Sequence, residues 1–273
     1  MKRDRLKRTG LIWLLGFLLG LFATEARAQE SATRRTIALS DPSLPAVVKA
    51  TVLQGSILVE SYDGQDVVIE VRPAGGASPK RGRSGERPED AENRAALPGG
   101  LKVTEADNIV AIRLEPHLGP ADLRLTVPRA TNLKLRNVGN GEIRVTKVQG
   151  QFELESLNGS IVLTDVSGAA VAHTVNGRLK ADFTRVAPEQ AMSFATVNGE
   201  IDLTFPAELK AKVKLASVTG KVACDFAVKP DQATPKRQWP GLRGMAVSGL
   251  INGGGGADLR VATVNGSIRI NKR

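Results

Sequence analysis

The sequence predicts an all-β fold, a β-solenoid of stacked coils of about 20 residues each, from three observations. A unit made of Ser or Thr, an aliphatic residue, Asn or Thr, Gly and a short alternating run recurs along the chain. The glycines of its copies, at 141, 159, 177, 199, 220 and 266, are 18, 18, 22, 21 and 46 residues apart. Apolar and polar residues alternate after each glycine, which is typical of a strand with one buried face.

The unit is clearest at 196–203, where it reads Thr-Val-Asn-Gly-Glu-Ile-Asp-Leu. The other copies share its glycine and the apolar residues two and four positions later, and they span 140–145, 156–163, 174–181, 217–224 and 263–270. The step of 46 residues before the last glycine is about two periods. It predicts that one copy there is degraded or replaced by a loop.

The residues at the centre of the unit are predicted to form sharp corners. Asn and Gly tolerate positive φ, so the backbone can change direction there. The predicted turn residues are Asn140 and Gly141, Asn158 and Gly159, Asn176 and Gly177, Asn198 and Gly199, Thr219 and Gly220, and Asn265 and Gly266.

The same dipeptide also suits a type I′ turn, so a β-hairpin meander or sandwich built on Asn-Gly turns is the alternative fold. A hairpin would place Val197 opposite Glu200 on one face, and the same mismatch recurs in the other copies. A solenoid allows the valine to point inward at the corner and stacks similar residues on each other. The pattern therefore favours the solenoid.

A single coil is too small to be stable by itself. Its roughly five inward side chains contribute about 1.5–3 kcal/mol each when buried, whereas ordering about 20 residues costs about 1–2 kcal/mol per residue. Stacking buries both open faces of a coil and supplies hydrogen-bond partners for its backbone. The copies are therefore expected to form one continuous domain at 36–272.

Residues 1–28 are expected to be a secretory signal peptide. They combine a basic start, an apolar run at 11–23 and a small-x-small cleavage site at 26–28. An uncleaved anchor is the alternative, but the apolar run is short for a bilayer span. The mature protein is therefore expected to be exported to the periplasm, the cell surface or the medium, and not to be an integral membrane protein.

Two segments interrupt the repeat domain. Residues 73–100 are charged and rich in Gly and Pro, and are expected to form a disordered surface insert. Residues 227–244 are expected to be a second loop insertion, in which Trp239 caps the core or contacts a glycan.

The charge of the chain suits anionic envelope polymers or a membrane surface, although simple solubility also explains it. The formal net charge is +10, and removal of 1–28 leaves +6. The basic cluster at 80–87 contains both signs of charge and no aromatic residue, so nucleic acid is not an expected partner.

No catalytic residue, cofactor or metal site is predicted, so the protein is not expected to be an enzyme. The single cysteine, Cys224, cannot form a disulfide within the chain. The two histidines, His117 and His173, are too few and too dispersed for a His-based catalytic or metal site. The calcium-type motif at 253–258 occurs once, whereas it functions in tandem. A polysaccharide-active enzyme on this scaffold would need a groove with two carboxyl groups about 5–10 Å apart. The outward acidic candidates are Glu142, Asp165, Asp182, Glu200 and Asp202.

The chain resembles the adhesin-like β-strand-repeat family of unknown function in bacterial envelope proteins, which is related in style to the auto-transporter adhesin head, or GIN, domain. The resemblance rests on the repeated unit, on the Val127–Pro128 step before Leu133-Lys134-Leu135, and on the Gly-rich run at 251–261 before the last copy. It implies a β-solenoid-like fold with no established activity and no catalytic residues to transfer.

These observations lead to the hypothesis of an exported, non-enzymatic envelope protein that acts as a structural, adhesive or binding module. Outward ladders of side chains would contact an extended polymer or another protein. The partner is not specified; an envelope polysaccharide and another envelope protein are the candidates. A polysaccharide-active enzyme and an envelope-stress signalling accessory are the alternative functions.

The inward and outward assignments can be tested at 201 and 202. Ile201→Asp is expected to lower the melting temperature sharply, because it buries a charge in the core. Asp202→Lys is expected to have little effect, because that position faces solvent. Thermal unfolding followed by circular dichroism measures both, and equal effects would show that the two columns are misassigned.

Overall fold

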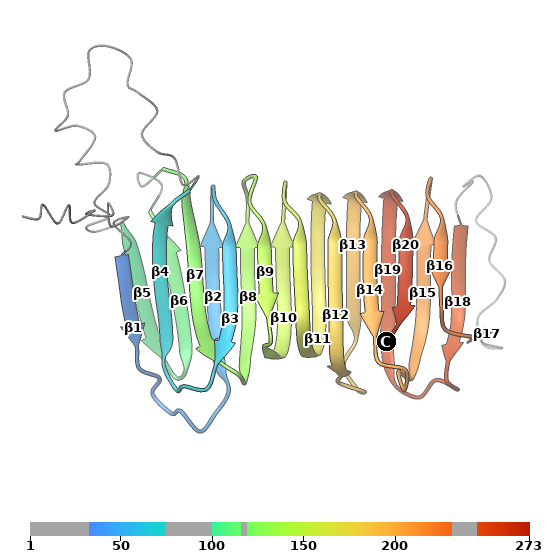
Figure 1. Cartoon of the computed structure of the whole chain (residues 1–273), viewed down its shortest axis with the longest axis horizontal. Helices are drawn as coiled ribbons and strands as arrows, with labels where there is room; N and C mark the ends of the chain where they lie inside the picture. The colour runs from blue at the N-terminus through green and yellow to red at the C-terminus, as the bar shows by residue number, and fades with distance from the viewer. Residues whose placement is uncertain (1–32, 75–99, 116–118, 231–244) are drawn as a thin grey trace, which may run out of the picture. The chain divides into compact units, whose positions relative to one another are not determined.

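The computed structural model describes residues 33–74, 100–115, 119–230 and 245–273, and in these ranges the regular secondary structure is β-strand throughout (Figure 1). The predicted signal peptide at 1–28 lies outside the described residues, as do most of the predicted insert at 73–100 and of the predicted loop at 227–244. The strands belong to one compact unit, Ser31–Arg273.

The strands form two rows that share one core, here named sheet I and sheet II. Sheet I contains, in spatial order, β5 (Leu101–Ala106), β6 (Ile109–Leu114), β2 (Ala46–Val52), β8 (Thr131–Asn137), β10 (Gln149–Ser156), the second half of β11 (Ile161–Asn176), β13 (Met192–Asn198), β19 (Ala257–Asn265), β15 (Ala211–Ser217), β18 (Met245–Ile251) and β17 (Val228–Lys229).

Sheet II contains the other half of each coil. Its strands, in spatial order, are β1 (Thr33–Ile37), β4 (Val67–Pro73), β7 (Ala121–Pro128), β3 (Ile57–Tyr62), β9 (Ile143–Thr146), the first half of β11, β12 (Leu179–Val186), β14 (Ile201–Phe205), β20 (Ile268–Lys272) and β16 (Val222–Cys224).

Equivalent residues of successive coils lie on top of each other. Ile161, Leu179, Ile201 and Ile268 are register partners along sheet II, and each is almost completely buried. Asp202, one residue after Ile201, faces outward and accepts a hydrogen bond of 2.6 Å from Asn271. Period-two alternation therefore places one aliphatic column in the core and one polar column outside.

The predicted β-solenoid is confirmed, and the hairpin alternative is not the fold. The corner at Asn158 and Gly159 joins β10 in sheet I to the first half of β11 in sheet II. β10 runs parallel to the second half of β11, whereas the strands that flank a hairpin turn are antiparallel neighbours.

The coils do not stack in chain order. The last coil, β19 with β20, lies between the coil β13–β14 and the coil β15–β16 (Figure 1). In the same way β2 and β3 lie between β6–β7 and β8–β9. Before Gly266 the chain passes outside β15 as β18 and returns on its inner side as β19, so an antiparallel strand takes the place of the predicted degraded copy. The alternative, replacement by a loop, falls on 231–244, outside the described residues.

Antiparallel strands occupy most ends of the otherwise parallel stack. β4 and β1 extend sheet II beyond β7, and β5 extends sheet I beyond β6. At the other end β18 and β17 extend sheet I beyond β15. These strands cover the open core of the terminal coils, which solenoids require for stability and solubility.

Candidate functional site

The predicted turn residues form a continuous column along one corner of the stack. The glycine carbonyls approach the next glycine in the spatial order Gly55, Gly141, Gly159, Gly177, Gly199, Gly266 and Gly220. Gly55 belongs to the copy at 52–59, which has Gln in place of Asn. The column therefore includes all six predicted glycines and follows the spatial order of the coils.

The glycines are required by contact between coils. A Cβ atom on Gly177 would lie 2.2 Å from the carbonyl oxygen of Gly159, and one on Gly199 would lie 1.9 Å from that of Gly177. Backbone atoms occupy that space, and they cannot move aside as a flexible side chain can. Only glycine allows the coils to approach this closely.

The expectation that these corners use positive φ is wrong. None of the six predicted glycines, nor the residue before each, has positive φ. Left-handed backbone occurs at the opposite corner instead, at Lys147 and Asp165, with φ of 57° and 53°. These two residues are also 18 positions apart, a signal that sequence reasoning did not use.

Hydroxyl groups of the unit bind the glycine column from inside. Thr174, Thr196 and Thr263 each donate a hydrogen bond of 2.9–3.1 Å to a glycine carbonyl of the adjacent coil. Ser217 donates to the Gly266 carbonyl at 2.7 Å and accepts from the Gly220 N–H at 2.9 Å. All four side chains are buried, so these hydrogen bonds are shielded from water.

The asparagines form a second ladder on the solvent side. Asn176, Asn198 and Asn265 each donate through Nδ2 to the Oδ1 of the preceding asparagine in the stack, always at 2.8 Å, and Asn158 is the first acceptor. Thr219 continues the ladder with a hydrogen bond of 3.5 Å to Asn265. Asn140 has no bond to this ladder in the described structure.

The aliphatic residue of the unit does not point inward, contrary to expectation. Leu157, Val175, Val197 and Val264 are 37–44 % exposed, whereas the Ser or Thr before each is buried. The reason is the period of two: Phe194 and Thr196 share the inward column of β13, so Val197 must face outward.

A shallow groove crosses the outer face of sheet I. One hollow of about 600 Å³ lies over β5, β6, β2, β8 and β10, and a second of about 740 Å³ extends over β11 to Gln190 and Ala191, just before β13. Lys49, Lys134, Glu153 and Glu155 line both, so the two hollows are continuous. The groove was not predicted, because no motif in the sequence marks it.

The groove contains two carboxylates, both on β10, and each is paired with a cation of β8. Glu153 lies 2.7 Å from Lys134, and Glu155 lies 3.6 Å from Arg136. Both carboxylates are about half exposed, at 49 %. Each carboxylate is therefore engaged with a neighbouring cation and open to solvent.

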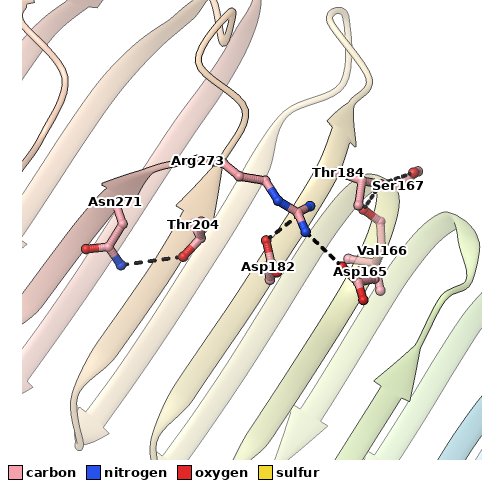
Figure 2. A network of polar contacts seen from close by, with 8 residues as sticks. All are labelled: Asp165, Val166, Ser167, Asp182, Thr184, Thr204, Asn271 and Arg273. Atoms are coloured by element: carbon pink, nitrogen blue, oxygen red, sulfur yellow. Dashed lines mark hydrogen bonds and ion pairs between the residues drawn. The ribbon is translucent and has the colours of Figure 1, made fainter.

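The acidic residues predicted as enzyme candidates are engaged elsewhere. Arg273 reaches Asp165 at 3.1 Å and Asp182 at 3.7 Å across neighbouring strands of sheet II (Figure 2). Glu142 pairs with Arg144, and Glu200 pairs with Arg178. The structure does not bring these five carboxylates together in one groove.

Nucleophile and metal chemistry find no support in the part of the chain that the structure describes. Partial burial, with the nearby Asp225 carboxylate, raises the pKa of the Cys224 thiol, which disfavours the reactive thiolate. His173 lies at the edge of the groove on β11, and His117 lies outside the described residues. Within the described ranges, no group of three His, Cys, Asp or Glu side chains could hold a metal ion.

The described residues also contain no helix long and apolar enough to cross a membrane.

Comparison with known proteins identifies a family. The sequence pattern of the family described as Toastrack DUF4097 matches residues 99–271. A candidate cell adhesion protein from Clostridium sporogenes ATCC 15579 is similar in structure, with a TM-score of 0.45 and 10 % identity over 89 % of this chain and 100 % of that chain. A candidate adhesin from Bacteroides fragilis NCTC 9343 has a TM-score of 0.34 and 10 % identity over 88 % of this chain and 96 % of that chain. No curated protein matches the chain in sequence. The expected resemblance to an adhesin-like family of unknown function is confirmed.

The backbone contacts of the glycine column predict that replacing one of its glycines by alanine lowers the free energy of unfolding. Gly177→Ala is expected to destabilise the fold by about 1–3 kcal/mol, because its Cβ overlaps the Gly159 backbone. Without that overlap, Gly→Ala at ordinary φ stabilises by about 0.4–1 kcal/mol. Urea unfolding measures the difference. Arg178→Ala, which removes an exposed ion pair at the same corner, is the control and should change stability by no more than about 1 kcal/mol. A stabilising Gly177→Ala would contradict the contact explanation.

Two serines in equivalent buried positions provide a matched pair. Ser217→Ala is expected to cost about 1–3 kcal/mol, because it leaves the Gly220 N–H without its partner. Ser156→Ala is expected to be neutral or stabilising, since it removes a buried hydroxyl that has no hydrogen-bond partner among the described residues. Parallel urea titrations measure both. Equal losses would show that the hydroxyl column does not act through hydrogen bonds.

Proposed function

The chain belongs to the Toastrack DUF4097 family, and from that premise we propose that it is an exported, non-catalytic structural or binding module of the cell envelope. Export rests on the signal-peptide pattern at 1–28. The proposed partner is an envelope polysaccharide or another envelope protein that lies along the stacked coils.

The observation that carries this proposal is the groove on sheet I. It lies on a wall of hydrogen-bonded strands, whose side chains are held in register by the coil stack. Adjacent strands are about 4.8 Å apart, so the groove presents side chains at a regular spacing. Such a surface suits an extended partner that makes repeated contacts.

The state of the acidic residues supports a non-catalytic role. Catalysis by two carboxylates requires both of them to be free to act on the glycosidic bond from opposite sides. Glu153 and Glu155 are half exposed and paired with cations, and the other acidic candidates lie outside the groove. These pairings support a binding role for the groove.

One observation favours a second function, a polysaccharide hydrolase. Glu153 and Glu155 are two residues apart on one face of β10, so both carboxylates line the same groove. A groove lined by two carboxylates is one part of what the enzyme alternative requires, although the ion pairs oppose it. The experiment on the proposed function therefore includes a test for hydrolysis.

The full chain, incubated with purified envelope polysaccharide, is expected to co-sediment with it and to release no new reducing ends. Sedimentation measures binding, and a reducing-end assay measures cleavage. Glu153→Gln with Glu155→Gln is the control for chemistry. Cleavage that this variant abolishes would establish the hydrolase instead. Absence of both binding and cleavage, or recovery of the chain only from the cytoplasm after fractionation, would contradict the proposed function.

A further inference from the structure

The two outer faces of the stack differ in charge. The positions of sheet II that alternate with its buried aliphatic columns carry nearly equal numbers of both signs, namely Arg34, Arg72, Arg124, Arg144, Lys180 and Arg269 against Glu60, Glu70, Asp122, Asp182 and Asp202. The charged residues of sheet II that lie outside these alternating positions are Arg35, Arg185, Lys272 and Asp165. Outward positions of sheet I are mainly basic, namely Lys49, Lys102, Arg113, Lys134, Arg136, Lys212, Lys214, Lys229 and Arg260 against Glu153, Glu155 and Asp258. Sheet I is also the face that carries the groove.

Several of these cations face each other across neighbouring strands. Lys49 is the register partner of Lys134, and Lys102 is the register partner of Arg113. Like charges directly opposite each other destabilise a sheet. One cation of each pair has a carboxylate partner, Lys134 with Glu153 and Lys102 with Glu115, which leaves Lys49 and Arg113 to attract an anion.

Two of the cations in the groove are not neutralised. Lys102 pairs with Glu115 at 2.7 Å, and Lys134 pairs with Glu153. Lys49 and Arg113 are exposed, line the groove, and have no ion-pair partner within the described ranges. They lie on the adjacent strands β2 and β6. The exposed ion pairs beside them are each worth about 0–1 kcal/mol, so a ligand can displace them.

The groove offers charge without aromatic stacking. Phe152, which lies beneath it, is 2 % exposed and cannot present its ring to a sugar. Recognition must therefore use charge and hydrogen bonds. Neighbouring strands are about 4.8 Å apart, which is close to the length of one pyranose ring in an extended chain. A chain of uronic acids that crosses the strands carries one carboxylate per sugar, so its charges recur along the row of cations.

We infer that this groove binds a linear, carboxylate-bearing polysaccharide across strands β6, β2 and β8, with Lys49 and Arg113 as its primary contacts. The inference rests on the proposed function and names the ligand class for it. Charge complementarity carries the argument: a basic groove meets one acidic group per sugar, while a neutral glycan offers hydroxyl acceptors but no charge to Lys49 and Arg113.

The test measures binding of an oligogalacturonate of fixed length to the full chain by isothermal titration calorimetry. Lys49→Glu with Arg113→Glu is expected to weaken binding at least about tenfold. The control, Lys180→Glu with Arg269→Glu, changes the net charge equally at exposed, unpaired positions of sheet II and is expected to weaken binding less than about twofold. Binding of the wild type is expected to fall as salt rises from about 50 to about 200 mM. Melting temperatures establish that both variants fold.

Each other outcome overturns the inference. Equal losses of affinity in the two double variants would mean that the oligogalacturonate is attracted by the net charge of the protein and not by a site in the groove. Equally tight binding of neutral dextran would exclude recognition by charge, and preference for anionic phospholipid vesicles would identify a different partner. If the oligogalacturonate does not bind but envelope polysaccharide still co-sediments, this inference fails while the proposed function stands. If the oligogalacturonate does not bind and the envelope polysaccharide does not co-sediment, the proposed function fails as well.

Discussion

The structure depends on close backbone contact between coils at the glycine column. Each carbonyl of the column occupies the space where a Cβ of the next coil would be, so side chains are excluded there. Buried hydroxyls satisfy most of these carbonyls from inside, as at Thr174 and Thr196, and the asparagine ladder joins the same coils outside. Contact, hydrogen bonding and burial thus act on one corner, and together they set the register of both sheets.

The register set at that corner explains why strands that are distant in the sequence pair with each other. Once Gly266 is seated between Gly199 and Gly220, β19 and β20 must pair with strands far away in the chain. The coils at both ends are therefore held by strands from other parts of the sequence. Antiparallel strands then extend sheet I at both ends, which limits the exposure of the core.

The same register gives the outer faces their properties. Side chains that share a column in the sequence lie beside each other in space, so charge accumulates or cancels along whole rows. Cancellation dominates on sheet II, where Arg273 bridges two aspartates (Figure 2). Accumulation dominates on sheet I, where Lys49 lies beside Lys134. The candidate binding surface is thus a consequence of stacking rather than of any local motif.

The sequence by itself determined the solenoid, its period and the inward aliphatic columns, because alternation and repeat spacing are local properties of each copy. It also marked the glycines, although for the wrong reason, since φ is local whereas their contacts are not. Only the tertiary structure decided the order of the coils, the contacts within the glycine column and the basic groove. Each of these depends on which coil lies beside which, and two coils that touch can be more than 60 residues apart, as Thr263 and Gly199 are.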